Sequence, residues 1–309
     1  MSPTRVSVVI PTRNGAATLP ALLDALWQQR TARPIEIIAV DSGSTDGTVE
    51  ILQRRVHHLL RVAPDEFDHG LTRNIGIDRA GGDLVVLLVQ DALPLSDTWI
   101  TTLTAPVVAD PTLAGSFARQ VPRPEAGVLT RRALARWAAG RTVASVSRIP
   151  DRAHFDELLP DQRLLACTFD NVASCIRRSV WKAHPFPATP IAEDLAWAHD
   201  VLLAGHGLAF VPDAVVMHSH DRPARYEYQR TRLLHARLHD LFGLHTIPTV
   251  PSLLRAAATS LADHVACEWR SPHRLRRSAA LAVAWPFGQS AGARDAITGR
   301  RYRPRAGAV

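Results

Sequence analysis

Three carboxylates stand where the sequence could support group-transfer chemistry. Asp91 follows an apolar segment typical of a buried strand, and Glu193 and Asp194 stand at the start of a segment with helical periodicity. A carboxylate at the end of such a strand can hold a divalent cation against a diphosphate, and a second carboxylate can accept a proton. The combination predicts transfer of a group from an activated donor.

The same positions also have a structural interpretation. Asp91 could cap the turn after its strand, because its oxygens need partners whether or not a cation is bound. Glu193 and Asp194 fall in the first turn of a helix, where the helix dipole stabilises negative charge. That dipole would keep Asp194 ionised, as a general base near neutral pH requires.

A histidine pair adds a second kind of metal ligand. His218 and His220 follow a strand-like segment, and alternation along an extended chain would point both imidazoles the same way. Together with Asp91 they could form a metal site, although the chain has 14 histidines and two alone indicate little. With Asp221 they could instead serve a metal-dependent hydrolase, which would leave the alternating N-terminal half unexplained.

The segment DSGSTDGT, residues 41–48, combines carboxylates, small hydroxyls and two glycines. Its backbone amides could approach a nucleotide, while Asp41 could accept hydrogen bonds from a base or ribose. It could also be a tight turn with Ser44 or Asp46 as a helix N-cap. No G-x-G-x-x-G follows the first strand and no P-loop motif occurs, which argues against dehydrogenases and P-loop proteins.

Residues 68–74 place further hydrogen-bond donors before a helix. Arg73 could meet phosphate oxygens, and Asn74 could hold the loop. The alternative is a surface loop in which Thr72 is the helix N-cap.

Apolar segments of strand length alternate with helical periodicity along the N-terminal half. The expected strands are residues 6–10, 35–40, 58–62 and 84–89, and the expected helices are residues 17–28, 47–55 and 72–80. The pattern predicts an α/β fold built on an open, mostly parallel sheet with helices on both faces. The ligand crevice of such a sheet lies at the carboxyl ends of its strands, where residues 11–13, 41–43 and 90–91 fall.

The pattern weakens beyond Pro94 and is unassigned between residues 125 and 170. The later expected elements are helices at 97–108 and 192–204 and strands at 114–120, 171–177 and 208–211. After Pro223 the chain is typical of helices, at 226–242 and 251–269, and a mobile tail is predicted from Gly288. We therefore expect a catalytic domain at 1–222 and a basic, mainly helical extension at 223–309.

Positive charge is concentrated in that extension. Residues 222–309 have 15 arginines and five acidic residues (+10), whereas the residues before them have 21 basic and 24 acidic residues (−3). The block could meet an anionic membrane or a diphosphate-linked acceptor, could be solvated surface, or could pack against the catalytic domain or a second subunit. Residues suited to membrane docking are Arg230, Arg232, Arg237, Trp269, Trp285 and Phe287.

The composition predicts a cytoplasmic protein. The first strand begins at Val6 and leaves no room for a secretory signal, and the apolar stretch 279–287 is too short to span a bilayer. The three cysteines have no metal-ligand spacing, which is typical of free thiols in a reducing compartment: Cys167, Cys175 and Cys267. We expect no nucleic-acid partner.

Five motifs in order resemble the inverting family 2 glycosyltransferases over about the first 220 residues. They are VSVVIPTRNG (6–15), VDSGSTDGT (40–48), QDA (90–92), ED (193–194) and HSH (218–220). The resemblance implies the GT-A fold. The stretch from Phe67 to Pro94 resembles the rhamnosyltransferase-like branch that builds bacterial cell-surface polysaccharides. That branch implies transfer of L-rhamnose from dTDP-rhamnose to a saccharide or lipid-linked acceptor at the cytoplasmic face of the inner membrane.

The resemblance also implies a role for each matching residue. Donor binding is implied for Pro11, Thr12, Arg13, Asp41, Ser42, Asp46, Arg73, Asn74 and Gln90. Asp194 would be the catalytic base with Glu193 in support, and Asp91, His218 and His220 would hold Mg²⁺ or Mn²⁺. The chain departs from the family's Asp-x-Asp pattern, because only Asp91 is acidic there. Magnesium commonly keeps several waters and takes few protein ligands, so one carboxylate is compatible with binding.

The expected mechanism is a direct displacement. Asp194 removes the proton of an acceptor hydroxyl, whose oxygen attacks the anomeric carbon opposite the departing nucleotide and inverts its configuration. Two alternatives remain beside the hydrolase: a UDP-sugar as donor, and a catalytically silent protein that binds sugar nucleotides or glycans. The sequence leaves open whether the protein forms homo-oligomers.

Overall fold

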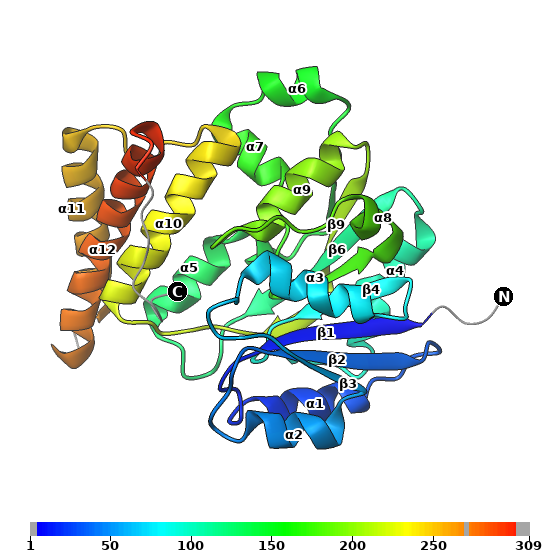
Figure 1. The fold of residues 1–309 in the computed structure, drawn as a ribbon. Helices are drawn as coiled ribbons and strands as arrows, with labels where there is room; N and C mark the ends of the chain where they lie inside the picture. The colour runs from blue at the N-terminus through cyan, green and yellow to red at the C-terminus, as the bar shows by residue number, and fades with distance from the viewer. Residues whose placement is uncertain (1–4, 269–271, 301–309) are drawn as a thin grey trace. The chain divides into compact units, whose positions relative to one another are not determined.

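The computed structural model describes residues 5–268 and 272–300 (Figure 1). The chain forms two compact units. The first contains the chain up to Arg123 together with Leu134–Glu157 and Ala166–His218. The second contains Pro124–Ala133, Leu158–Leu165 and the chain from Ser219 onward. The second unit thus takes two short segments from within the region that the sequence left unassigned.

A mixed sheet forms the centre of the first unit. Its strands follow the order β3-β2-β1-β4-β8-β6-β9-β5, and β7 pairs with β9. Strands β1 to β4 are mutually parallel, β8 is antiparallel to both β4 and β6, and β6 and β9 are parallel. The strands are β1 Val6–Thr12, β2 Ile35–Asp41, β3 His58–Arg61, β4 Leu84–Leu88, β5 Leu93–Pro94, β6 Leu113–Val121, β7 Ser145–Ser147, β8 Ala173–Arg177 and β9 Gly207–Met217.

Helices cover both faces of this sheet. In Figure 1, α1 and α2 lie on one side of β1 to β3, and α3 lies on the other. The helices up to residue 203 are α1 Leu19–Trp27, α2 Thr48–Arg55, α3 His69–Arg79, α4 Trp99–Ala109, α5 Val128–Arg136, η1 Ala138–Gly140, α6 Arg152–Glu157, α7 Pro160–Ala166, α8 Arg178–Ala183 and α9 Glu193–Leu203. The α/β fold predicted from the alternating pattern is confirmed.

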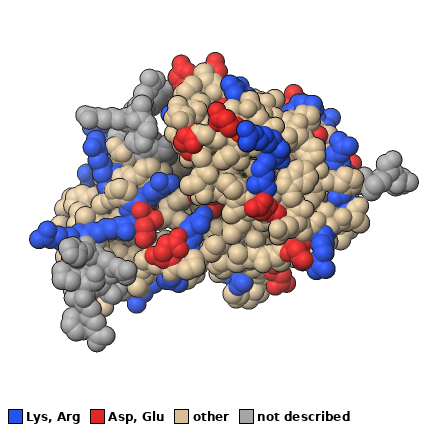
Figure 2. Space-filling view, turned by 90° about the horizontal axis from the view of Figure 1, so that it is seen from below, with Lys and Arg blue, Asp and Glu red and all other residues tan. Residues whose placement is uncertain are grey.

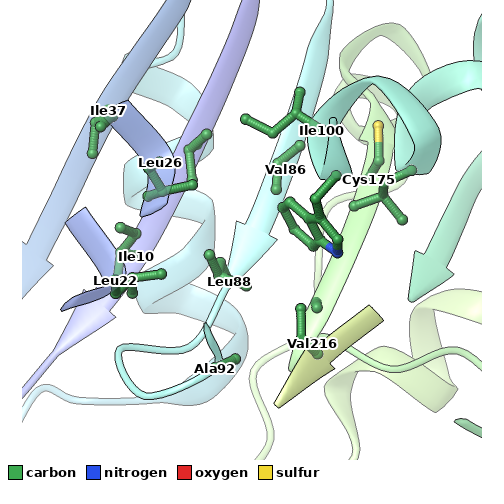
Figure 3. Packing of buried hydrophobic residues seen from close by; sticks show 14 of the residues in the cluster. Ile10, Leu22, Leu26, Ile37, Val86, Leu88, Ala92, Ile100, Cys175 and Val216 are labelled. Carbon is green, nitrogen blue, oxygen red and sulfur yellow. The ribbon is translucent and has the colours of Figure 1, made fainter. Parts of the chain in front are cut away.

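The core lies between the sheet and helices α1, α2 and α4. Side chains from β1, β2 and β4 alternate along their strands, so that Ile10, Ile37 and Val86 share a face with Leu22 and Leu26 of α1 (Figure 3). On the opposite face α3 approaches closely because Gly76 has no side chain. A Cβ there would lie 2.4 Å from Cγ1 of Val9. Unbroken burial of β4 explains why its sequence is continuously apolar.

The sheet directions place several chain segments at one edge. The carboxyl ends of β1, β2, β4, β6 and β9 meet there, and so does the amino end of the antiparallel strand β8. Residues that follow the parallel strands and residues that precede β8 are therefore brought together. This edge carries the candidate site.

The second unit is mainly helical, with α10 Ala224–Phe242, α11 Val250–Glu268 and α12 Pro272–Ile297. Arg232 of α10 binds Asp295 of α12 through two hydrogen bonds of 2.6 and 2.9 Å. Helix α12 continues to Ile297, so residues 288–297 are helical where a mobile tail was predicted. The end of that predicted tail, and Trp269, lie outside the described residues. Among the described helices, none is long and apolar enough to cross a membrane.

Helix α3 begins earlier than its periodicity indicates. Asp68 caps it by accepting hydrogen bonds from the N–H groups of Gly70 and Leu71, at 2.8 and 2.9 Å. The interpretation of Thr72 as the N-cap is therefore wrong. His69, Gly70 and Leu71, placed in a loop by the sequence, form the first turn of the helix.

Candidate active site

Three loops at the strand-end edge are tied to one another. Gln90, in the turn after β4, donates from Nε2 to the carbonyl oxygen of Arg13 and accepts at Oε1 from its N–H, both at 2.9 Å. Asn14 donates its N–H to Oγ of Ser44 at 2.8 Å and accepts from the N–H of Thr45 at 2.9 Å. The predicted donor loops after β1, β2 and β4 therefore form one connected surface. Gln90 acts in it as a clamp on the backbone of Arg13.

Asp41 is occupied within its own loop. Its Oδ1 accepts from the N–H groups of Gly43 and Ser44 at 3.1 and 3.0 Å, and its Oδ2 accepts from the hydroxyls of Ser44 and Thr12 at 2.5 and 3.2 Å. The adjacent Ser42 donates its N–H to the carbonyl oxygen of Thr12 at 2.9 Å. The carboxylate is 1% exposed and has a full set of local donors. Its described contacts are those of a loop-shaping residue.

Asp46 connects the second loop to the first. It accepts from the N–H of Ala16 at 3.0 Å and from the hydroxyl of Thr48 at 2.5 Å. These hydrogen bonds, with that of Thr48 the strongest, lower the pKa of Asp46. Helix α2 begins after Gly47, whose φ of 91° is readily available to glycine. Pro11 lies beside this loop edge in the half-buried end of β1.

Asn74 holds a distant chain segment rather than a loop at this edge. Its Nδ2 donates to the carbonyl oxygen of Phe186 at 2.8 Å. Its Oδ1 accepts from Nε1 of Trp181 at 2.8 Å and from the N–H of Phe186 at 3.1 Å. The side-chain amide thus has protein partners for both its oxygen and its nitrogen. Donor binding by Asn74 stays a prediction.

Arg73 and Glu193 form a buried ion pair. Nη1 of Arg73 lies 2.9 Å from Oε1 of Glu193 and donates to the carbonyl oxygen of His69 at the same distance. The two side chains are 6% and 7% exposed. Burial would raise the pKa of Glu193, but the positive charge of Arg73, aided by His69, holds that pKa below its ordinary value. Glu193 is therefore held as an anion, and Arg73 lies beside it.

Asp194 has the opposite electrostatic environment. Its Oδ2 accepts from the N–H of Asn171 at 3.3 Å, and its Oδ1 accepts from the N–H of Leu195 at 2.8 Å. Burial raises the pKa of Asp194 well above its ordinary range, and the charges of Glu193 and Asp170 raise it further. The expectation that the helix dipole keeps Asp194 ionised is outweighed by these effects. A raised pKa makes Asp194 a stronger base once it is deprotonated.

A carboxylate and an imidazole face each other nearby. Nε2 of His218 lies 3.7 Å from Oδ1 of Asp91, and both side chains are mostly buried. The other ring nitrogen of His218, Nδ1, lies 3.1 Å from Oε1 of Gln120. Arg123 donates to the carbonyl oxygen of Asp91 at 2.5 Å and fixes the turn. Oxygen and imidazole nitrogen in this arrangement fit a divalent cation such as Mg²⁺ or Mn²⁺.

Asp170 and Asn171 connect this pair to the carboxylates of α9. Asp170 accepts from Nε2 of Gln120 at 2.7 Å. Asn171 donates from Nδ2 to Oε1 of Glu193 at 3.2 Å, besides its backbone bond to Asp194. Burial raises the pKa of Asp170, and three hydrogen-bond donors partly oppose that rise. Asp170 thus faces the side of the site with Gln120 and His218, and Asn171 faces the side with Glu193 and Asp194.

Sequence reasoning missed four residues of this site: Gln120, Asp170, Asn171 and Trp137, whose indole donates to Oδ2 of Asp170 at 2.9 Å. The available signal was the expected strands: Gln120 ends the one at 114–120, Asn171 begins the one at 171–177, and Asp170 precedes it. The placement of Asp170 and Asn171 depends on the direction of β8, because only an antiparallel β8 brings its amino end to the shared edge. Side-chain alternation does not reveal that direction.

His220 and Asp221 belong to the second unit. Asp221 accepts from Oγ1 of Thr130 at 2.5 Å and from the N–H of Gly127 at 3.2 Å, and it lies 3.4 Å from Arg277. These contacts assign Asp221 a structural task and remove a ligand from the hydrolase interpretation. The role of His220 as a metal ligand stays a prediction.

Comparison with known proteins identifies the family of this chain. The family model described as glycosyl transferase family 2 matches residues 7–161. The chain is 31% identical over 239 residues to the O-antigen chain rhamnosyltransferase RfbN of Salmonella typhimurium, covering 75% of this chain and 73% of the relative. The chain belongs to glycosyltransferase family 2. A second relative of this glycosyltransferase, the O-antigen chain rhamnosyltransferase WbaN of Salmonella anatum, is 30% identical over 74% of this chain and 72% of its own length.

Solved structures establish the fold of this glycosyltransferase. The mannosyltransferase PcManGT from Pyrobaculum calidifontis, in complex with GDP-Man and Mn²⁺, has a TM-score of 0.59 at 20% identity and covers 97% of this chain and 89% of its own. Glucosyl-3-phosphoglycerate synthase from Mycobacterium tuberculosis, with Mn²⁺, UDP and glucosyl-3-phosphoglycerate, has a TM-score of 0.55 at 20% identity and covers 78% and 81%. The GT-A fold is thereby confirmed.

Proposed function

We propose that this glycosyltransferase moves L-rhamnose from dTDP-rhamnose to a saccharide or lipid-linked acceptor, with inversion at the anomeric carbon. Two curated relatives with about 30% identity are O-antigen chain rhamnosyltransferases, which supports the sugar and the kind of acceptor. The segment 67–94 supports the same donor through its resemblance to the rhamnosyltransferase-like branch. The acceptor would be a growing cell-surface polysaccharide.

The opposite pKa shifts of Glu193 and Asp194 carry the assignment of the base. Arg73 keeps Glu193 anionic, and that fixed negative charge raises the pKa of its neighbour Asp194. Paired carboxylates whose environments separate their pKa values are typical of acid–base sites. Asp194 would accept the proton of the acceptor hydroxyl as the new C–O bond forms and the bond from the anomeric carbon to the diphosphate breaks.

Asp91 and His218 would hold the cation. Their carboxylate oxygen and imidazole nitrogen fit Mg²⁺ or Mn²⁺, with His220 proposed as a third ligand from the His-x-His spacing. Such an ion would neutralise negative charge on the leaving diphosphate. Gln90 joins this turn to the loop after β1, so donor and cation would be positioned by one connected segment.

The loop edge would bind the nucleoside diphosphate. Thr12, Arg13 and Ser42 belong to this edge, and Asp41 and Asp46 fix the shape of the loop. The exposed guanidinium of Arg13 can reach a negatively charged ligand. The Asp41 oxygens already have local hydrogen-bond partners. We therefore assign Asp41 to shaping the nucleoside pocket rather than to binding the nucleobase by itself.

We also propose peripheral contact between the second unit and an anionic membrane. Val250, Leu254, Leu261 and Val265 are exposed and recur on one face of α11, and the unit is rich in arginine. Two residues singled out from sequence have other tasks. Arg232 binds Asp295, and the indole of Trp285 donates to Glu227. Basic and acidic side chains are interspersed over the face drawn in Figure 2. The apolar stripe of α11 carries this proposal.

Liposome sedimentation tests the membrane contact. Leu254→Ser with Leu261→Ser should reduce binding to anionic vesicles, whereas Val143→Ser, an exposed change in the first unit, should not. Loss of a dimer in the double variant, with no change in vesicle binding, would assign the stripe to a homo-oligomer instead.

A donor panel tests the proposed reaction. dTDP-rhamnose and UDP-sugars are offered with lipid-linked and oligosaccharide acceptors, with and without Mg²⁺ or Mn²⁺, and the product anomer is read by NMR. We expect metal-dependent transfer from dTDP-rhamnose with inversion. Transfer only from a UDP-sugar would change the donor and keep the mechanism. Donor binding without transfer or slow donor hydrolysis would favour a silent binding protein.

A further inference from the structure

The two ring nitrogens of His218 have different surroundings. Nε2 faces Oδ1 of Asp91 at 3.7 Å, and Nδ1 faces Oε1 of Gln120 at 3.1 Å. A neutral imidazole has one N–H and one lone pair, so the position of its proton decides which nitrogen can bind a cation. Whatever fixes that proton also fixes whether His218 can act beside Asp91.

The orientation of the Gln120 amide follows from Asp170. Oδ2 of Asp170 lies 2.7 Å from Nε2 of Gln120 and 2.9 Å from Nε1 of Trp137. Oδ1 accepts from the N–H of Val172 at 2.9 Å. An indole and a backbone N–H can only donate, so these partners require Asp170 to accept. Gln120 must therefore turn its NH₂ group toward Asp170 and its oxygen toward His218.

The hydrogen bonds that join Asp170, Gln120 and His218 are shielded from water. Gln120 and Asp170 are 6% and 8% exposed. Gln120 is paired with Val216 in the parallel ladder of β6 and β9, and the N–H of His218 extends that ladder by donating to Val121 at 3.0 Å. Water has little access to replace either hydrogen bond. The oxygen of Gln120 is thus a fixed acceptor for Nδ1–H of His218.

We propose that Gln120, oriented by Asp170, is a positioning residue that holds His218 in the tautomer protonated on Nδ1. Nε2 is then left with a lone pair for a divalent cation beside Asp91. Outer hydrogen bonds of this kind orient metal-binding imidazoles in general. The inference rests on the proposed use of a cation. It adds Gln120 and Asp170 to the residues on which that use depends.

The same loop also reaches the base. Asn171 follows Asp170 directly and donates to both Glu193 and Asp194. The Asp170–Asn171 dipeptide therefore sets the cation ligand on one side and the proton acceptor on the other. A shift of this dipeptide would disturb both groups together.

The first test removes the Gln120 oxygen that accepts the hydrogen bond from His218. Mn²⁺ binding is titrated by electron paramagnetic resonance, with Mn²⁺ alone and with dTDP, in wild type, Gln120→Leu and the matched control Gln53→Leu on the surface of α2. We expect Gln120→Leu to weaken Mn²⁺ binding by about 10–100-fold, the usual effect of losing such an outer contact. Gln53→Leu should bind as wild type does. Melting temperatures confirm that all three proteins are folded.

A reciprocal exchange separates positioning from general damage. Asp170→Asn lets the Gln120 amide reverse and present a donor to His218, whereas Gln120→Glu places two carboxylates against each other. Each single variant should therefore lose Mn²⁺ affinity. Together, Gln120→Glu and Asp170→Asn restore a donor–acceptor pair with an oxygen facing Nδ1. The indole N–H of Trp137 then loses its acceptor, so we expect the double variant to bind Mn²⁺ more tightly than either single variant and less tightly than wild type.

The metal-free protein gives an independent readout. ¹⁵N shifts of histidine distinguish the two tautomers, and His218→Gln identifies the relevant signal. We expect Nδ1–H in wild type and in the double variant, and Nε2–H in Asp170→Asn. An Nε2–H wild-type ring, or unchanged Mn²⁺ binding in Gln120→Leu while Asp91→Asn loses it, overturns the positioning role and leaves the metal site standing. A wild type that binds no Mn²⁺ overturns the proposed metal use itself.

Discussion

The carboxylates of the loop after β2 and those near α9 have the same chemistry and opposite surroundings. Asp41 and Asp46 are surrounded by hydroxyl and N–H donors from their own and the adjoining loop. Asp170, Glu193 and Asp194 are buried close together, and among the described residues a cationic side chain contacts only Glu193 of the three. In the first group the negative charge is stabilised by neutral hydrogen-bond donors. In the second it remains available to raise the pKa of a neighbour.

The difference shows that burial alone does not mark a reactive carboxylate. Asp41 is at least as buried as Glu193, yet its hydrogen bonds serve to fix the backbone of its own loop. Asp194 is set apart because Glu193 is held as an anion beside it. The arrangement of donors and charges separates shaping residues from reacting ones.

Removing the base should have the largest effect. Asp194→Asn keeps the size of the side chain and removes its basicity, so kcat should fall about 10²–10⁴-fold while dTDP binding persists. Steady-state transfer assays and dTDP titration measure the two quantities. Asp24→Asn, an exposed change on α1, is the matched control. Near-normal turnover of Asp194→Asn would assign the base elsewhere.

Breaking the buried ion pair should mainly affect stability. Arg73→Met leaves Glu193 as an uncompensated buried charge, which should lower the free energy of unfolding by about 3–5 kcal/mol. Urea denaturation measures the change. Adding Glu193→Gln removes the charge and should recover most of the loss. If the double variant is no more stable than Arg73→Met, the pair does not account for the effect.

The pKa of Asp194 should depend on Glu193. Glu193→Gln removes a negative neighbour and leaves the positive charge of Arg73, so the pKa of Asp194 falls. A general base acts when deprotonated, and the acid limb of the kcat/KM profile should therefore move to lower pH. An acid limb that stays in place, or moves to higher pH, would contradict the coupling.

The free energy of unfolding should also depend on pH, and it should fall where deprotonation of Asp194 activates the enzyme. Because the folded pKa of Asp194 is raised, the folded state binds more protons than the unfolded state between the ordinary and the raised value. The free energy of unfolding then decreases as pH rises through that window. Asp194→Asn should weaken this decrease in denaturation curves recorded across the window.

The smallest effect is expected in the loop after β2. Asp41→Asn keeps one oxygen acceptor for backbone N–H groups, and the hydroxyls of Thr12 and Ser44 can turn to accept from the new amide. We expect a loss of about 1 kcal/mol in urea denaturation. A loss in dTDP affinity much larger than the change in stability would indicate direct contact between Asp41 and the donor.

Much of the fold follows from local patterns in the sequence. The unbroken apolar stretch at 84–89 predicts a central strand because both faces of β4 are covered, and the helix of α1 follows from its leucine spacing. The region around residues 128–166 gave no pattern because its helices are short and partly exposed. Helix α12 was not predicted, and its second half was assigned to a mobile tail because Gly288 and Gly292 resemble tail residues. They are instead contact points where α12 packs on α10.

The candidate site was only partly predictable for a different reason. Asp91, Glu193 and Asp194 stand at expected element ends, so their positions follow from the βαβ pattern. The roles of Asn74 and Arg73 depend on partners more than a hundred residues away, at Phe186 and Glu193. Gln120 and Asp170 can be recognised as site residues only when the strand order is known. Periodicity carries no information on which distant segments become neighbours.

The strand order has a consequence for how the chain assembles during synthesis. Strands β1 to β4 find their neighbours within the first 88 residues, but β8 separates β4 from β6 in the finished sheet. Until residues 173–177 have been made, the edge of β4 and the whole of β6 lack these partners. Open strand edges of this kind invite association with other chains. The half of the sheet that carries Gln120, and that ends just before His218, is therefore completed last, when β9 leaves the ribosome.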